Sequence, residues 1–312
     1  MNLLYTSTKI QFNGETINSI NILTPDEFVD ELIEQISEKI DLRHKTNTIS
    51  IIEVEGFVST HLDRFKEKAL KVKPTPNPIE RLIESTDKYT HLNENIVLFA
   101  IFATIIALAG LFLDNVSIVI GAMLLSPMLG PINAFAVNAN LGRTKYIIKS
   151  QQTSLLLMAC VIATSFIITL VALLFAPLNI TSQIASRGHP TIIDMLLAVV
   201  LGFAAGLALV TDFSELLVGV AVAVALVPPV TVTGIGLAIM NFHLALGAFL
   251  LSIINLLGLQ LGCTILLNLK GVTPRRDYQK NTAKRYYKSF VYIILIIMVI
   301  IALILLIQNK YT

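Results

Sequence analysis

Seven apolar segments constrain this chain more than any other feature of its sequence. Each is near the length that a helix needs to cross a hydrocarbon layer of roughly 30 Å. Hydrophobic residues make up 54% of the 312 residues and charged residues 14%, which excludes an ordinary soluble globular protein. We therefore expect an α-helical polytopic membrane protein with about seven transmembrane helices. The segments are 96–113, 116–137, 155–175, 192–210, 216–240, 244–267 and 290–307.

Basic residues gather in two of the loops between these segments. Arg143, Lys145 and Lys149 follow the second segment, and seven Lys and Arg residues from Lys270 to Lys288 follow the sixth. Loops rich in Lys and Arg stay on the cytoplasmic side of a membrane. The sequence therefore predicts a multi-pass protein of the cell (plasma) membrane, with its N-terminus in the cytoplasm and its C-terminus outside.

Two stretches of the apolar region share one spacing. Thirteen positions separate Pro127 from Asn140, and thirteen separate Pro228 from Asn241. Each copy holds three apolar segments, and an odd number makes the second copy enter the membrane from the opposite side. This arrangement is the 3+3 inverted repeat found in many transporters, and here the seventh segment follows it.

The composition along the chain predicts five regions. Before the membrane part, β-branched runs predict strands at 2–8, 16–23 and 48–58, and Thr24 opens a T-x-x-E capping box before an amphipathic helix. A second helix is expected at 61–72. This domain is either a structural skirt or a regulatory ligand domain. The regions are 1–73, a small cytosolic α/β domain; 74–95, a proline-rich linker and lead-in helix; 96–175, transmembrane repeat 1; 191–268, transmembrane repeat 2; and 269–312, a basic cytosolic loop and final transmembrane helix.

Prolines inside the second and fifth segments predict two broken helices. A proline removes a backbone N–H and leaves the carbonyl four residues earlier without its partner. Hydrocarbon offers no water in exchange, so interrupted helices usually line a cavity, and an inverted repeat would bring both breaks to the bilayer midplane. The candidate lining of a substrate or ion pathway is Ser126, Pro127, Gly130, Pro131, Asn133, Pro228, Pro229, Thr231, Thr233, Gly234 and Asn255.

A plainer interpretation of the same residues stays open. Prolines kink many packed membrane helices, and Ser, Thr and Asn side chains then satisfy the freed carbonyls within the bundle. Asn138 and Asn140 in the first copy, Asn241 in the second and Gln260 in the sixth segment supply further hydrogen-bonding groups.

Side chains that carry catalytic chemistry are scarce in the apolar segments. Asp114, Asp194, Asp212 and Glu215 fall at segment ends, and no Lys or Arg lies in the middle of a segment. We therefore expect no enzyme, no catalytic residue, no cofactor and no metal site. The charge distribution forms no basic stripe for a nucleic acid. A permeant would meet backbone dipoles, hydroxyls and amides, which suit a small ion or polar solute of either sign.

Two motifs in this order resemble a known signature. They are GAMLLSPMLGPI at Gly121–Ile132 and VAVALVPP at Val222–Pro229. The chain thereby resembles a prokaryotic integral membrane family catalogued as domain of unknown function 389, over about residues 95–268. The resemblance implies a membrane protein and supplies no established substrate, and it carries over no binding or catalytic residue.

These observations favour a transporter or channel for a small ion or polar solute, whose partner is the lipid bilayer. The alternative is a membrane-anchored sensor or assembly scaffold whose cytosolic N-terminal domain binds a ligand or partner. Gly202-x-x-x-Gly206 and Gly258-x-x-x-Gly262 predict close helix packing. We expect a homo-oligomer, in which some of these faces join protomers.

Overall fold

The computed structural model divides into two units, Met1–Ile79 and Glu80–Thr312, and each is treated on its own. It describes residues 4–12, 15–23, 29–40, 47–50, 79–175, 177–211, 215–274 and 277–311.

The first unit contains a β-hairpin and a helix. Strands β1 (Leu4–Phe12) and β2 (Glu15–Leu23) pair antiparallel, with Leu4 opposite Leu23 and Phe12 opposite Glu15. Helix α1 (Val29–Lys39) buries Val29 and Ile33, which lie one turn apart on the same face. The first two strands and the amphipathic helix are therefore confirmed, and β1 extends four residues past its expected end.

Other expectations for this unit fall largely outside the described residues. The capping box at Thr24, most of the strand expected at 48–58 and the helix expected at 61–72 are among them. Residues 47–50 are described and belong to neither a helix nor a strand.

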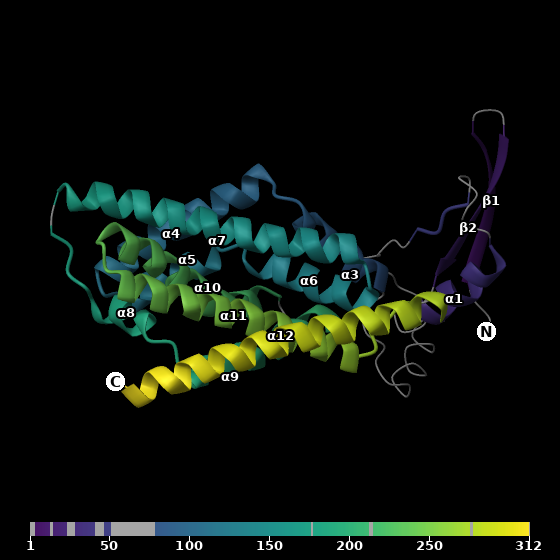
Figure 1. The fold of residues 1–312 in the computed structure, drawn as a ribbon. Helices are drawn as coiled ribbons and strands as arrows, with labels where there is room; N and C mark the ends of the chain where they lie inside the picture. Colours follow the sequence, from purple (N-terminus) through teal and green to yellow (C-terminus); the bar gives the residue numbers. More distant parts are fainter. Residues whose placement is uncertain are drawn as a thin grey trace. The chain divides into compact units, whose positions relative to one another are not determined.

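Every regular element among the described residues of the second unit is a helix, and the long helices run side by side (Figure 1). Five helices are long and apolar enough to cross a membrane, and a sixth crossing results if α5 and α6 form one bent span. Helix α10 is 24 residues long, and after Glu215 its sequence is mostly apolar. The membrane class is thus clear, with five to six candidate spans. The elements are α3 (Ile79–Asp87), η2 (Lys88–Thr90), α4 (Glu94–Phe112), α5 (Val116–Leu124), α6 (Leu129–Leu141), α7 (Thr144–Leu173), α8 (Ser182–Ala185), η3 (Ser186–Gly188), α9 (Ile192–Val210), α10 (Glu215–Ala238), α11 (Phe242–Leu269) and α12 (Asp277–Tyr311).

Helix α11 forms the centre of the bundle. In its most apolar stretch 67% of the residues are buried, against 22–39% in the other four candidate spans. It packs against α6, α9, α10 and α12. Side chains on α11 therefore face protein on most sides, whereas α7 and α12 keep broad apolar faces exposed, as expected of helices in contact with lipid.

Both Gly-x-x-x-Gly motifs are used in the contact between α9 and α11. A β-carbon on Gly202 would lie 3.0 Å from the Cα of Gly262, and one on Gly206 would lie 3.1 Å from the carbonyl oxygen of Cys263. A β-carbon on Gly258 would overlap Ala198. Small residues here allow the two backbones to touch. The motifs thus join helices within one chain, and the expectation that some of these faces join protomers stays a prediction.

Two helix turns of the bundle have the same construction. At Asp114 and Met240 the backbone is left-handed, with φ of 52° and 55°. The amide of Asn115 bonds to the carbonyl of Gly110 at 2.8 Å, and that of Asn241 to Gly236 at 2.9 Å. The Asn side chain then caps the next helix in both cases.

These turns lie at one end of the bundle. Thr181 Oγ1 donates to the carbonyl of Leu111 at 2.7 Å, and the rings of His189 and His243 lie 5.8 Å apart. The connection between α7 and α9 therefore meets both the α4–α5 turn and the α10–α11 turn. Arg143, which precedes α7, lies at the other end.

Candidate functional site

The break between α5 and α6 is a bend of 52° at Leu125–Met128. Pro127 has no N–H to continue α5. The amide of Ser126 bonds to the carbonyl of Met123 at 3.2 Å, and its hydroxyl accepts from the amide of Met128 at 3.4 Å. The bend predicted at Ser126–Pro127 is thus present, and the serine on it helps to close the connection.

Pro131 has a different role from the one the sequence predicts. Helix α6 begins at Leu129, so Pro131 lies in its first turn, where backbone N–H groups have no partner within the helix. A proline is tolerated in this turn because it removes no helical hydrogen bond. The break therefore depends on Pro127 rather than on both prolines.

The expected break at Pro228 and Pro229 is not seen. Helix α10 continues from Glu215 to Ala238 with both prolines inside it. Pro229 deprives the carbonyl of Ala225 of its helical partner, and the side-chain Nδ2 of Asn255 on α11 donates to this same carbonyl at 2.5 Å. A neighbouring helix supplies the missing donor, which explains how α10 stays intact through a proline.

The two threonines of α10 bond within their own helix. Thr231 Oγ1 donates to the carbonyl of Val227 at 2.8 Å, and Thr233 Oγ1 to that of Pro229 at 2.9 Å. Gly234 lies where a β-carbon would overlap Ser165 on α7. These three candidates therefore have structural partners, as the plainer interpretation of the prolines expects.

Gly130 also marks a close contact. A β-carbon there would overlap the ring of Tyr89, which lies on η2 just before α4. Two positions before Tyr89, Asp87 binds Arg143 through two hydrogen bonds of 2.9 Å each. The lead-in segment α3–η2 is thereby held against both ends of α6, at Gly130 and beyond its C-terminus at Arg143.

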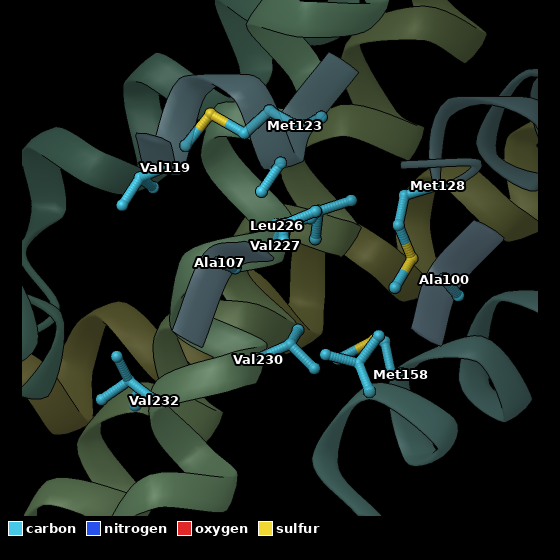
Figure 2. Close-up of a cluster of buried hydrophobic side chains, with 14 of the residues drawn as sticks. Ala100, Ala107, Val119, Met123, Met128, Met158, Leu226, Val227, Val230 and Val232 are labelled. Atoms are coloured by element: carbon cyan, nitrogen blue, oxygen red, sulfur yellow. The ribbon is translucent and has the colours of Figure 1, made fainter. Parts of the chain in front are cut away.

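The break faces α10 across an apolar contact. Met123 and Met128 flank the break, Met158 comes from α7, and all three are buried in one cluster with α10. Figure 2 shows these methionines around Leu226, Val227 and Val230. Methionine is flexible and adapts to changes in the surrounding packing. The two proline segments thus share one cluster of buried hydrophobic side chains.

Polar groups instead line the contact between α6 and α11. Asn133 Oδ1 accepts from Cys263 Sγ at 3.8 Å, and Asn140 Nδ2 donates to the carbonyl of Thr264 at 3.0 Å. Asn133 and Asn140 lie seven positions apart, on one face of α6. Beside this face Gln260 of α11 donates to Gln151 of α7 at 2.7 Å.

Several buried oxygens of α6 and α11 have no hydrogen-bonding partner among the residues that the structure describes. They are Oδ1 of Asn138, Oδ1 of Asn140 and Oγ1 of Thr264, on side chains 0–2% exposed. Buried polar atoms are nearly always paired with protein or ordered water, so each unpaired one calls for an explanation.

The site predicted from the sequence is therefore divided between two places. Ser126 and Pro127 form the break, and Asn133 faces the polar contact on α11. Thr264 is not among the predicted site residues, because a lone threonine in an apolar helix gives no signal. The spacing of seven between Asn133 and Asn140 was the available clue.

Comparison with known proteins agrees with the motifs at the break and at the prolines of α10. Residues 123–261, which run from the end of α5 into α11, match the model of the family described as "Domain of unknown function (DUF389)". These residues belong to the DUF389 family. The match contains the break, α10 and the α6 side of the polar contact, whereas Cys263 and Thr264 lie just beyond it.

A relative extends the similarity beyond the DUF389 region. "Uncharacterized protein MJ0678" of Methanocaldococcus jannaschii is 26% identical over 285 residues, which cover 89% of this chain and 83% of that protein. No solved structure matches the chain.

Proposed function

We propose that this DUF389 protein is a transporter or channel for a small ion or polar solute. The observation that carries the proposal is the broken helix α5–α6, which meets α10 through a methionine-rich apolar contact. Hydrophobic constrictions close a pore to ions by excluding water. In this proposal the packed side chains of Met123, Met128 and Val227 form the closed gate, and the bend lets α5 move relative to α6.

The polar face of α6 continues the proposed route. Asn133 lies two turns from the break, and Asn140 lies two turns farther, next to Arg143 at the end of the bundle. The basic residues there are expected in the cytoplasm. The route would then run from the Asp114 end, past the gate and along the α6–α11 contact, in a protein with seven crossings and a cytoplasmic N-terminus.

In this proposal the two copies of the inverted repeat have different roles. Its first copy has a flexible break, whereas its second copy is held straight by the bond from Asn255 to Ala225. We expect α10 to act as the fixed wall and α5 as the moving one.

Ion flux into proteoliposomes tests the proposal. Purified protein is reconstituted and supplied with gradients of alkali cations, halides and small polar solutes. Val227→Thr places a hydroxyl in the apolar contact with little change in volume, and we expect it to raise flux several-fold by wetting the gate. Val210→Thr, at a buried site in a separate cluster at the end of α9, is the matched control and should leave flux unchanged.

Absence of flux for every solute in both wild type and Val227→Thr would reject the transport proposal. The sensor or scaffold function would then be the better interpretation. An equal rise in both variants would reject the gate, because it would indicate a general loss of packing.

A further inference from the structure

We infer that Asn140 on α6 and Thr264 on α11 bind a small monovalent cation such as Na⁺ or K⁺. The inference deepens the proposed function by naming a substrate class, and it rests on that function only for the step from binding to transport.

The orientation of Asn140 is fixed by its hydrogen bonds. Its Nδ2 donates to the carbonyl of Ala136 at 2.9 Å and to that of Thr264 at 3.0 Å. Exchanging the amide nitrogen and oxygen would bring an oxygen against two carbonyl oxygens, so this assignment is determined by the network. The free atom of Asn140 is therefore Oδ1, which is an acceptor only.

Thr264 adds a second free oxygen at the same contact. Its carbonyl receives the bond from Asn140, and its own hydroxyl has no partner within the described part of the chain. The other buried hydroxyl on these helices, that of Ser252, donates to the carbonyl of Ala248, four residues earlier, at 2.8 Å. Thr264 departs from that pattern and keeps the lone pairs of its hydroxyl available.

The chemistry of these oxygens selects the ligand. Uncharged amide and hydroxyl oxygens match the coordination preference of hard cations. Helices α6 and α11 contain no Asp or Glu, so the site lacks the carboxylates that divalent cations usually require. Asn140 also lies in the last turn of α6, where the helix dipole is negative and favours a cation. A monovalent cation fits all three observations.

A buried water molecule is the competing occupant, because it too would pair with these oxygens. The two occupants predict different responses to salt. A cation that binds the folded protein raises its thermal stability with the logarithm of cation concentration, whereas a water molecule gives no dependence on which cation is present.

Thermal unfolding of the full-length protein in detergent distinguishes them. NaCl and KCl are varied against N-methylglucamine chloride at constant ionic strength. We expect a melting temperature that rises with Na⁺ or K⁺ in wild type and in Thr264→Ser, which keeps the hydroxyl. In Thr264→Val the cation dependence should vanish or require at least tenfold more cation, while Thr231→Val, which removes a paired hydroxyl, should retain it.

Three results would overturn the inference: no cation dependence in wild type, full dependence in Thr264→Val, or equal loss in Thr231→Val. Cation flux measured on the same variants separates the two proposals. Cation-dependent stability without flux would leave the binding site intact and reject transport, whereas flux unaffected by Thr264→Val would reject this site as part of the route.

Discussion

Replacing Asn255 by leucine should destabilise the bundle, because one backbone carbonyl loses its hydrogen-bond donor. Leucine keeps the branching of asparagine at Cγ but is larger, and it removes the donor to the carbonyl of Ala225. Pro229 cannot supply another, because it has no N–H. A buried acceptor left unpaired costs about 1–3 kcal/mol, while side-chain hydrogen bonds in membrane proteins average roughly 0.6 and reach about 1.7 kcal/mol. We expect a loss of about 1–2 kcal/mol in the free energy of unfolding.

A second substitution makes this prediction specific. Pro229→Ala restores a backbone N–H directed at the Ala225 carbonyl, so it should recover most of the stability lost in Asn255→Leu. Pro228→Ala is the matched control, because its new N–H would serve the carbonyl of Val224 instead. The coupling between Asn255 and Pro229 should be about 1 kcal/mol, and that between Asn255 and Pro228 near zero.

Reversible unfolding in mixed detergent micelles, followed by circular dichroism, measures these free energies. The reasoning is refuted if Pro229→Ala fails to rescue Asn255→Leu, or if Pro228→Ala rescues it equally well. Either result would mean that Asn255 stabilises the bundle by packing rather than by replacing the proline's lost hydrogen bond.

Three further predictions follow from close contacts and from one carboxylate. Gly262→Ala should cost about 1–3 kcal/mol of stability by forcing α9 and α11 apart. In contrast, the β-carbon of Gly121→Ala meets nothing within 4 Å, so this control should be neutral or stabilising by about 0.5–1 kcal/mol. Equal effects of the two substitutions on stability would contradict this prediction. Gly130→Ala should destabilise the protein, and adding Tyr89→Ala should relieve the clash, so an additive double mutant would argue against it. Hydrogen bonds from the backbone N–H of Gln183 and the hydroxyl of Ser182 lower the pKa of Asp114 below its ordinary 3.8. This contribution to stability is present above pH 4 and lost as pH falls through the folded pKa, and Asp114→Asn should flatten that part of an acid denaturation curve.

The helices were predictable because their signal is local. Apolar length alone placed α4, α9 and α11 within about two residues of their bounds, since a segment that avoids water over some twenty residues has few alternatives. The bend at Pro127 was predictable for the same reason, because a proline acts on its own helix.

The outcome at Pro229 was not predictable, because it depends on a residue 26 positions later. Sequence shows that the Ala225 carbonyl loses its helical donor, and it does not show that Asn255 on the next helix replaces it. The unpaired oxygens of Asn140 and Thr264 are a similar case. Whether these oxygens have hydrogen-bonding partners depends on how α6 packs against α11, and Asn140 and Thr264 lie 124 positions apart in sequence.

Accessibility of the break to water tests the central claim most directly. In a protein with Cys160 and Cys263 replaced by serine, Ser126→Cys places a thiol on the break, and Ser165→Cys places one on α7, buried against Gly234. A small charged thiosulfonate reagent is applied to intact membranes, and the rate of modification is followed. If the break lines a route that opens to water, Ser126→Cys will be modified at least tenfold faster than Ser165→Cys. Equal, negligible rates at both positions would contradict a route through the break.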